Sequence, residues 1–142
     1  MEVAGWCPFA DHPPETDDDY FEALAAAVFQ ARFNPAIVRQ RWPWIRRAFA
    51  DFRLRTVAGW ADAEVERLLA EPGIIRNRKK VQATIRNARD LLQRAERYGS
   101  VRAYLQSFGT DVEALVADLD GWAHYIGAPS IRWFLRCARV GQ

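Results

Sequence analysis

The chain has 142 residues, of which 50% are hydrophobic and 27% are charged, a composition typical of one globular domain with a single core. It contains no run of about 18 apolar residues, and its start lacks a basic segment followed by an apolar one, so we expect neither a membrane span nor a signal peptide.

The formal net charge of +2 conceals an uneven distribution of charge. Residues 1–72 carry 8 basic and 12 acidic side chains, whereas residues 73–142 carry 12 basic and 6 acidic ones. A surface that binds phosphate is therefore expected mainly in the C-terminal half. Cys7 and Cys137 are the only cysteines, and they predict no disulfide framework, a reducing compartment and a cytoplasmic protein.

Residues 1–15 predict an irregular N-terminal arm, because they include three prolines and few apolar positions at helical spacing. Thr16 follows as a good N-cap. Aspartates fill the next three positions, where carboxylates favour the helix dipole. A buried helix is therefore predicted over residues 17–33.

The rest of the chain also predicts helices. Asn34 and Pro35 combine a cap with a proline at the first helical position, and Pro43 repeats the pattern. These signals and the later caps predict helices over 35–42, 43–50, 62 to before Pro72, 78–97, 100–108, 111–119 and 129–139. No segment alternates like a strand. The predicted fold is all-α, one compact multi-helix domain over residues 1–142.

The stretch 73–89, GIIRNRKKVQATIRNAR, holds six basic residues and no acidic one, while its apolar residues keep close to a helical period. This pattern predicts a helix with its apolar face in the core and its entry loop available to polyanions. A solvated helix face is the alternative interpretation of the same charges.

The same stretch resembles the signature of the DNA-3-methyladenine glycosylase I family, helix-hairpin-helix enzymes that excise alkylated bases from DNA. Further similarities lie at Gly5-Trp6, Pro14 to Asp17, Gln30-Ala31, Glu64 to Leu68 and Tyr125 to Gly127. The resemblance implies that duplex DNA binds the chain. The DNA contacts that it implies are Arg76, Asn77, Arg78, Lys79, Lys80, Gly127 and Ser130.

A helix-hairpin-helix is expected over 111–139. In that motif, backbone N–H groups of the hairpin and of the following helix N-terminus bind a DNA phosphate, because these donors have no partner within the helix. Gly127 and Ser130 occupy the matching positions. Asp118 and Asp120 depart from the pattern, since basic residues are expected ahead of a strong phosphate clamp.

The base pocket that the resemblance implies includes Trp6 and Gln30, but the family's base-contacting glutamate aligns with Ala27 and a pocket aromatic aligns with Pro35. A catalytic residue is therefore not assigned. Removing a cationic methylated base does not require a strong general acid, so base flipping and binding can carry the reaction.

The family's structural zinc is expected to be absent. Its first cysteine aligns with Ala4, and its C-terminal ligands are missing. Cys7, His12, His124 and Cys137 show no metal-ligand spacing, so no metal and no cofactor are predicted.

The function implied is a monomeric glycosylase that excises an alkylated purine and releases the free base. A non-catalytic helix-hairpin-helix module that has lost the pocket is one alternative. A helical protein-interaction domain with an arginine-rich face is another.

Overall fold

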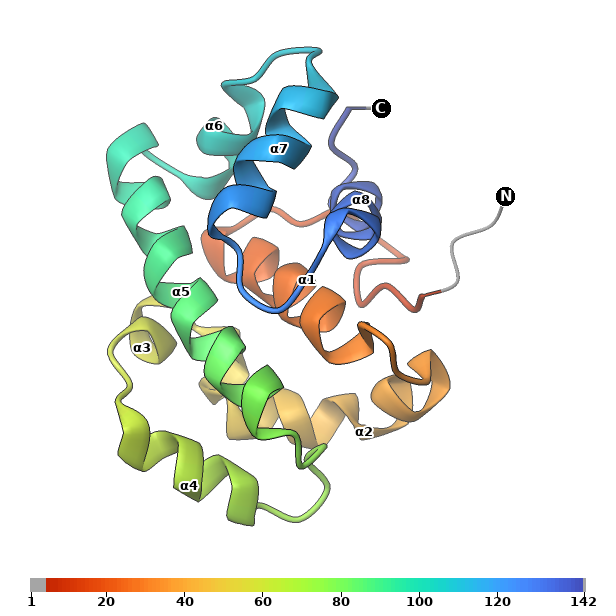
Figure 1. Cartoon of the computed structure of the whole chain (residues 1–142), viewed down its shortest axis with the longest axis vertical. Coiled ribbons are helices and arrows are strands. Elements are labelled where there is room, and N and C mark those ends of the chain that lie inside the picture. Colours follow the sequence, from red (N-terminus) through yellow and green to blue (C-terminus); the bar gives the residue numbers. More distant parts are fainter. Residues whose placement is uncertain (1–4, 142) are drawn as a thin grey trace.

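Residues 5–141 are described by the computed structural model, and their regular structure is entirely helical (Figure 1). The elements are α1 (Asp17–Gln30), α2 (Pro35–Ala48), the 3-10 helix η1 (Ala50–Phe52), α3 (Leu54–Ala58), α4 (Asp62–Ala70), α5 (Arg78–Tyr98), α6 (Val101–Gln106), α7 (Val112–Trp122) and α8 (Ala128–Cys137). The predicted all-α fold is confirmed, and α7 and α8 form the expected hairpin near the C-terminus. No helix in the described range is both long and apolar enough to cross a membrane.

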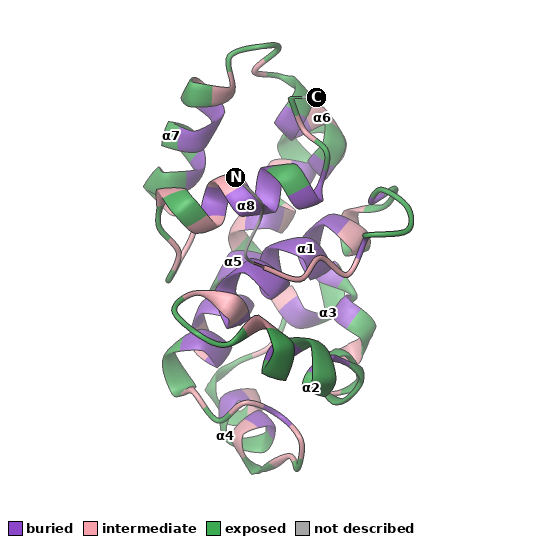
Figure 2. Cartoon of the chain, turned by 90° about the vertical axis from the view of Figure 1, so that its right-hand side faces the viewer, coloured by how far each residue is buried: buried purple, intermediate pink, exposed green. Residues whose placement is uncertain are grey.

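Helix α1 lies at the centre of the fold, with every residue from 20 to 29 buried (Figure 2). Thr16 caps it in a reciprocal box with Asp19, as the sequence predicts. The neighbouring aspartates accept hydrogen bonds from backbone N–H groups at the starts of other helices. Asp18 Oδ1 accepts the backbone N–H of Leu54 at 2.8 Å, and Asp17 Oδ1 accepts that of Val101 at 2.8 Å. The acidic first turn of α1 therefore also fixes the starts of α3 and α6.

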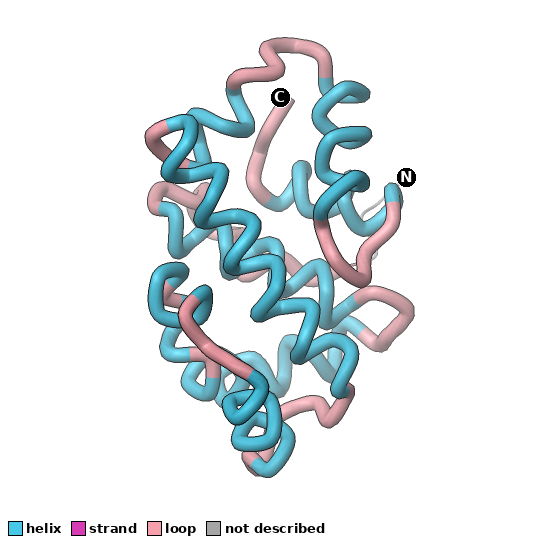
Figure 3. Tube along the Cα trace, turned by 60° about the vertical axis from the view of Figure 1, so that its left-hand side comes forward, coloured by secondary structure: helices cyan, strands magenta, loops and turns pink. Residues whose placement is uncertain are grey.

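Helix α5 is the longest element, with 21 residues, and crosses one side of the molecule (Figure 3). Asn77 caps its start by accepting the backbone N–H of Lys80, and Gly99 ends it at φ 96°, a conformation that favours glycine. It packs against α1, α3, α4 and α6. Because α5 touches so many elements, its side chains can fix their relative positions.

Two features of the segment 35–58 differ from the prediction. Pro43 lies inside the single helix α2 and does not divide it, because Val38, Trp42 and Ile45 keep one continuous face buried on both sides of the proline. Helices η1 and α3 were not predicted. Phe52 anchors this turn by stacking on Trp42 with ring centroids 5.2 Å apart, a tertiary contact without a periodic signal in the sequence.

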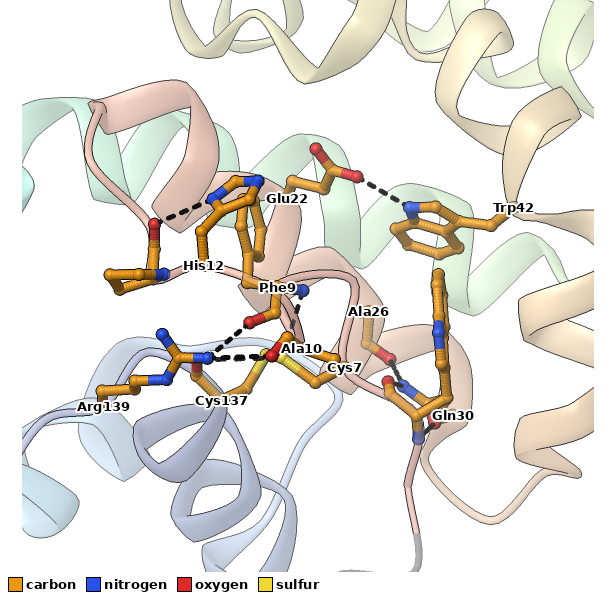
Figure 4. The surroundings of a disulfide bond; sticks show 12 residues. Cys7, Phe9, Ala10, His12, Glu22, Ala26, Gln30, Trp42, Cys137 and Arg139 are labelled. Atoms are coloured by element: carbon orange, nitrogen blue, oxygen red, sulfur yellow. Dashed lines mark hydrogen bonds between the residues drawn. A yellow bond between two sulfur atoms is a disulfide. The ribbon is translucent and has the colours of Figure 1, made fainter.

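The N-terminal arm is irregular over its described residues, as predicted, but it is firmly attached. A disulfide joins Cys7 to Cys137, which are 130 positions apart in the sequence, and their Cα atoms lie 5.6 Å apart (Figure 4). Arg139 also donates hydrogen bonds to the carbonyl oxygens of Phe9 and Ala10 at 3.0 and 3.2 Å. The prediction of no disulfide framework is wrong, because the fold lays the arm along α8 and brings the two cysteines together.

Candidate functional site

A cavity of about 350 Å³ lies between the end of α1 and the start of α8. Its lining residues are Gly5, Ala27, Gln30, Ala31, Arg32, Phe33, Pro35, Pro129, Ser130, Trp133 and Arg136. Ala27 and Pro35 are the two positions at which the sequence departs from the family's pocket. The volume falls in the range of small-molecule sites.

Aromatic surface and positive charge characterise this cavity. Phe33 is 40% exposed, and Trp133 contributes a nearly buried indole that packs directly against Gly5. Arg32 and Arg136 are exposed and line the same cavity. The lining includes no carboxylate. The cavity therefore offers aromatic faces to a flat ligand and cationic groups to phosphates near its mouth.

Gln30 binds the arm through both ends of its amide. Its Oε1 accepts the backbone N–H of Trp6 at 2.6 Å, and its Nε2 donates to the carbonyl oxygens of Trp6 at 2.8 Å and Ala26 at 3.1 Å. These bonds occupy the amide, so Gln30 fixes the arm against α1 (Figure 4). Trp6 packs edge-on against Trp42, with ring centroids 5.4 Å apart, and lines an adjoining hollow of about 420 Å³.

A second hollow of about 450 Å³ adjoins the cavity over the hairpin, and the two share Ala31, Arg32, Pro129 and Ser130. Gly127 is the N-cap of α8 and has no side chain to cap it. The backbone N–H groups of Ala128 and Ser130 lie in the first turn, where the helix dipole is positive. This end of α8 has the geometry of an anion-binding site.

A larger hollow of about 750 Å³ lies between the N-terminal arm and α2. Its charged lining includes three arginines and two aspartates, and the indoles of Trp6 and Trp42 also line it; the charged residues are Arg39, Arg46, Arg47, Asp11 and Asp51. Arg46 is paired with both Asp51 and Glu22. We favour the smaller cavity as the functional site because it meets the start of α8 and is lined by Ala27 and Pro35, the positions that align with the family's pocket.

The stretch 73–89 does not present its charges as one phosphate-binding track. Arg78 pairs with Glu66 through two hydrogen bonds, and Asn77 caps α5. Lys80 is only 3% exposed, so the prediction that it contacts DNA is wrong. Arg76 and Lys79 remain exposed at this end of α5.

Lys80 reaches from α5 to the end of α1. Its Nζ donates hydrogen bonds to the carbonyl oxygens of Phe29 at 2.7 Å and Ala31 at 2.8 Å, and it lies 5.0 Å from the ring centroid of Phe33. Burial lowers the pKa of the Lys80 amine from its ordinary 10.5 to about 8. The lysine thus supports the wall of the cavity that Phe33 and Ala31 form.

The lowered pKa of Lys80 predicts how stability depends on pH. Between pH 8 and 10.5 the unfolded chain binds more protons at this amine than the folded protein, so the free energy of unfolding rises with pH and falls as the pH drops through 8. From about pH 7.5 to about pH 9.5 we expect a rise on the order of 1 kcal/mol. Urea denaturation should show this rise in wild type and in Thr84→Val, a buried control. Its persistence in Lys80→Met would contradict the assignment.

A family model described as methyladenine glycosylase matches residues 10–122. The chain belongs to this family. The DNA-3-methyladenine glycosylase 1 of Escherichia coli (strain K12) is 40% identical over 81 residues, which make up 56% of this chain and 43% of that enzyme. The matched region therefore spans less than half the length of this methyladenine glycosylase.

Solved methyladenine glycosylases share the fold. A crystal structure of 3-methyladenine DNA glycosylase I has 26% sequence identity and a TM-score of 0.77, with 90% of this chain and 81% of that chain covered. The enzyme from Staphylococcus aureus has 22% identity and a TM-score of 0.80, with 91% of this chain and 79% of that chain covered. A likeness at that identity shows the fold alone. A variant solved in complex with 3-methyladenine has 23% identity and a TM-score of 0.80, with 91% and 80% covered.

The residues present do not fit the zinc site that the family resemblance implies. Cys7 and Cys137 are joined to each other in a disulfide. The ring of His12 contacts the carbonyl oxygen of the next residue, Pro13, and the ring of His124 bonds Asp90 on α5. Within residues 5–141 no three potential ligands gather. Ala4, the position aligned with the family's first cysteine, lies outside the described residues. We derive no step through a metal.

Phe33 and Trp133 are the site residues that the sequence analysis did not identify. Phe33 gave no local signal of exposure, because the sequence places it as the last residue of the predicted helix 17–33, whereas α1 ends at Gln30 and leaves Phe33 40% exposed. Trp133 gave no such signal, because a tryptophan among apolar residues of an amphipathic helix usually belongs to the core. The contact of Trp133 with Gly5 of the arm depends on the tertiary fold.

Proposed function

We propose that this protein is a monofunctional DNA glycosylase that flips out and excises an alkylated, cationic purine such as 3-methyladenine. The observation that carries the proposal is the aromatic cavity between the end of α1 and the anion-binding start of α8, in a chain of the methyladenine glycosylase family. Its partners are duplex DNA and the released base. We propose that it acts as a cytoplasmic monomer without a metal or cofactor.

Phosphate binding positions the duplex over the cavity. The N–H groups at the start of α8 donate hydrogen bonds to one phosphate, and Arg32 and Arg136 add positive charge at the cavity. Arg76 and Lys79 are exposed at the start of α5 and extend the basic surface. This set of contacts replaces the single track along 76–80 that the sequence predicts.

The flipped base is held by stacking. A cationic purine gains from the faces of Phe33 and Trp133, because cations are attracted to aromatic faces and flat rings stack on them. Trp6, fixed by Gln30, forms the arm side of the adjoining hollow. Without a carboxylate in the lining, this aromatic contact is the main attraction for the cation.

The cleavage step needs little help from a proton donor. The bond from C1′ of the sugar to N9 of the base breaks, and its electron pair neutralises the positive charge of the base. Water adds to C1′ and loses a proton to solvent, which leaves an abasic site and free 3-methyladenine. The protein lowers the barrier by holding the unstacked base and the sugar in place.

The direct test is release of bases from duplex DNA treated with a methylating agent, with the products separated by chromatography. We expect free 3-methyladenine from methylated DNA and no base from untreated DNA. Duplex binding without release of any base would support the alternative, a non-catalytic DNA-binding module, which the alanine at position 27 favours. Failure to bind DNA at all would favour the protein-interaction domain.

Ala27 gives a gain-of-function test of the same cavity. Ala27 is 2% exposed and lines the cavity, so Ala27→Glu would place a carboxylate beside the cationic base. We expect base release to rise about 10-fold, since an opposite charge in a partly desolvated site is worth more than about 1.4 kcal/mol. Ala27→Gln has the same size without the charge and should not reproduce the gain. Equal rates for wild type, Ala27→Glu and Ala27→Gln would contradict the placement of the base.

A further inference from the structure

Two buried side chains of α5 each hold the backbone of one wall of the candidate site. Lys80 bonds the end of α1, and Asn87 bonds the hairpin between α7 and α8. They are seven residues apart, about two helical turns, so both project from one face of α5. We propose that Lys80 and Asn87 are positioning residues that set the base cavity at a fixed distance from the phosphate-binding start of α8. This inference rests on the proposed function.

Lys80 completes the C-terminus of α1 from another helix. The last carbonyl groups of a helix lack internal partners and lie at the negative end of its dipole. Helix α1 has no basic residue in its own last turn, and the chain leaves it through Arg32 at φ 55°, an uncommon conformation for a residue other than glycine. The Lys80 ammonium bonds two of these carbonyls and so holds the turn that presents Phe33.

Asn87 holds the hairpin in both directions. Its Oδ1 accepts the backbone N–H of His124 at 2.7 Å, and its Nδ2 donates to the carbonyl oxygen of His124 at 3.3 Å. Asn87 is only 1% exposed, and loss of its amide leaves the backbone N–H and carbonyl of the half-buried His124 without this partner. His124 precedes Gly127 by three residues, and its ring also bonds Asp90 at 2.9 Å. The loop that leads into α8 is thereby fixed to α5.

Neither residue lines the cavity, so each acts through the wall that it holds. A reaction on a flipped base requires that the base and the bound phosphate keep the spacing of one nucleotide, and small misplacements lower rates strongly. Thr84 lies between the two residues on the same buried face, but its Oγ1 donates to the carbonyl of Lys80 within α5. Replacing Thr84 is therefore a suitable control, because it removes a buried polar group that contacts neither wall of the site.

The test compares Lys80→Met, Asn87→Ala and the control Thr84→Val with two separate probes. Free 3-methyladenine, followed by tryptophan fluorescence, reports on the cavity, and undamaged duplex DNA, followed by anisotropy, reports on the phosphate site. Lys80→Met should weaken binding of the free base about 10-fold and change duplex affinity less than about twofold. Asn87→Ala should show the reverse pattern, and both should lower base release about 10-fold or more. Thr84→Val should match wild type in all three measurements.

Milder variants keep the test valid if these chains fail to fold. Lys80→Gln keeps one amide donor group, and Asn87→Asp keeps the acceptor for the His124 N–H, so each should show a smaller form of the same pattern. Parallel loss of both affinities in each variant, tracking a fall in melting temperature, would overturn the positioning role. So would wild-type affinities in all variants. If wild type bound both probes but released no base, the proposed function would fail. The two binding patterns would still test whether Lys80 and Asn87 position the cavity and the phosphate site.

Discussion

Phe33→Ala is expected to lower the rate of base release about 5-fold to 150-fold, which corresponds to the loss of about 1–3 kcal/mol for one stacked base. Phe33 lines the cavity and is 40% exposed, so its removal leaves little empty space in the core. The free energy of unfolding should change by less than about 1 kcal/mol. Single-turnover release from methylated duplex DNA measures the effect.

Ile37→Ala is the matched control for Phe33→Ala. Ile37 is 38% exposed on the first turns of α2 and lines none of the hollows around the site, so its truncation removes similar exposed apolar surface without touching the base. We expect this variant to release the base at the wild-type rate. Equal losses from Phe33→Ala and Ile37→Ala would assign Phe33 to the fold and leave the cavity without its stacking face.

Removal of the Cys7–Cys137 bond should have the largest effect on stability. The bond closes a loop of about 130 residues and restricts the unfolded chain accordingly, so we expect the double variant Cys7→Ser, Cys137→Ser to lose about 2–5 kcal/mol of unfolding free energy. Denaturation of wild type with and without a reductant should reproduce the difference. The double variant should not respond to the reductant.

The same variant separates attachment of the arm from the chemistry of the site. Gln30 and Arg139 still bind the arm when the disulfide is absent, so base release at low temperature should persist. A reductant that leaves the stability of wild type unchanged would contradict the presence of the bond. Loss of release in a fully folded double variant would show that the bond itself orders the site.

Local signals in the sequence predicted much of the fold. Thr16 and the aspartates after it predicted the start of α1, and the basic amphipathic stretch predicted α5. Such signals are reliable because caps and helical periods depend only on near neighbours. Pro43 was misinterpreted, since burial on both sides of it outweighs its local preference. The 3-10 turn at Phe52 depends on stacking with residues distant in sequence.

The site was predicted less well because charge along a sequence does not reveal exposure. Lys80 falls on the same helical face as Thr84 and Asn87, and its phase along α5 was the one available signal that it is buried. Nothing in the spacing of two cysteines near opposite ends of the chain reveals that they meet. The resemblance identified Ala27 and the start of α8, and the structure places them around one cavity.

The most direct test of base binding in the cavity between α1 and α8 is to locate the base by NMR. A ¹⁵N-labelled sample would be titrated with free 3-methyladenine and followed by ¹H–¹⁵N correlation spectra. We expect saturable shifts for the Gln30 side-chain amide, the Trp133 indole and the backbone amides of Phe33 and Ser130. The Trp122 indole, which bonds Tyr104 away from the cavity, should not shift. Shifts centred on the charged hollow at Arg39 and Arg47, or no saturable shift, would contradict base binding in this cavity.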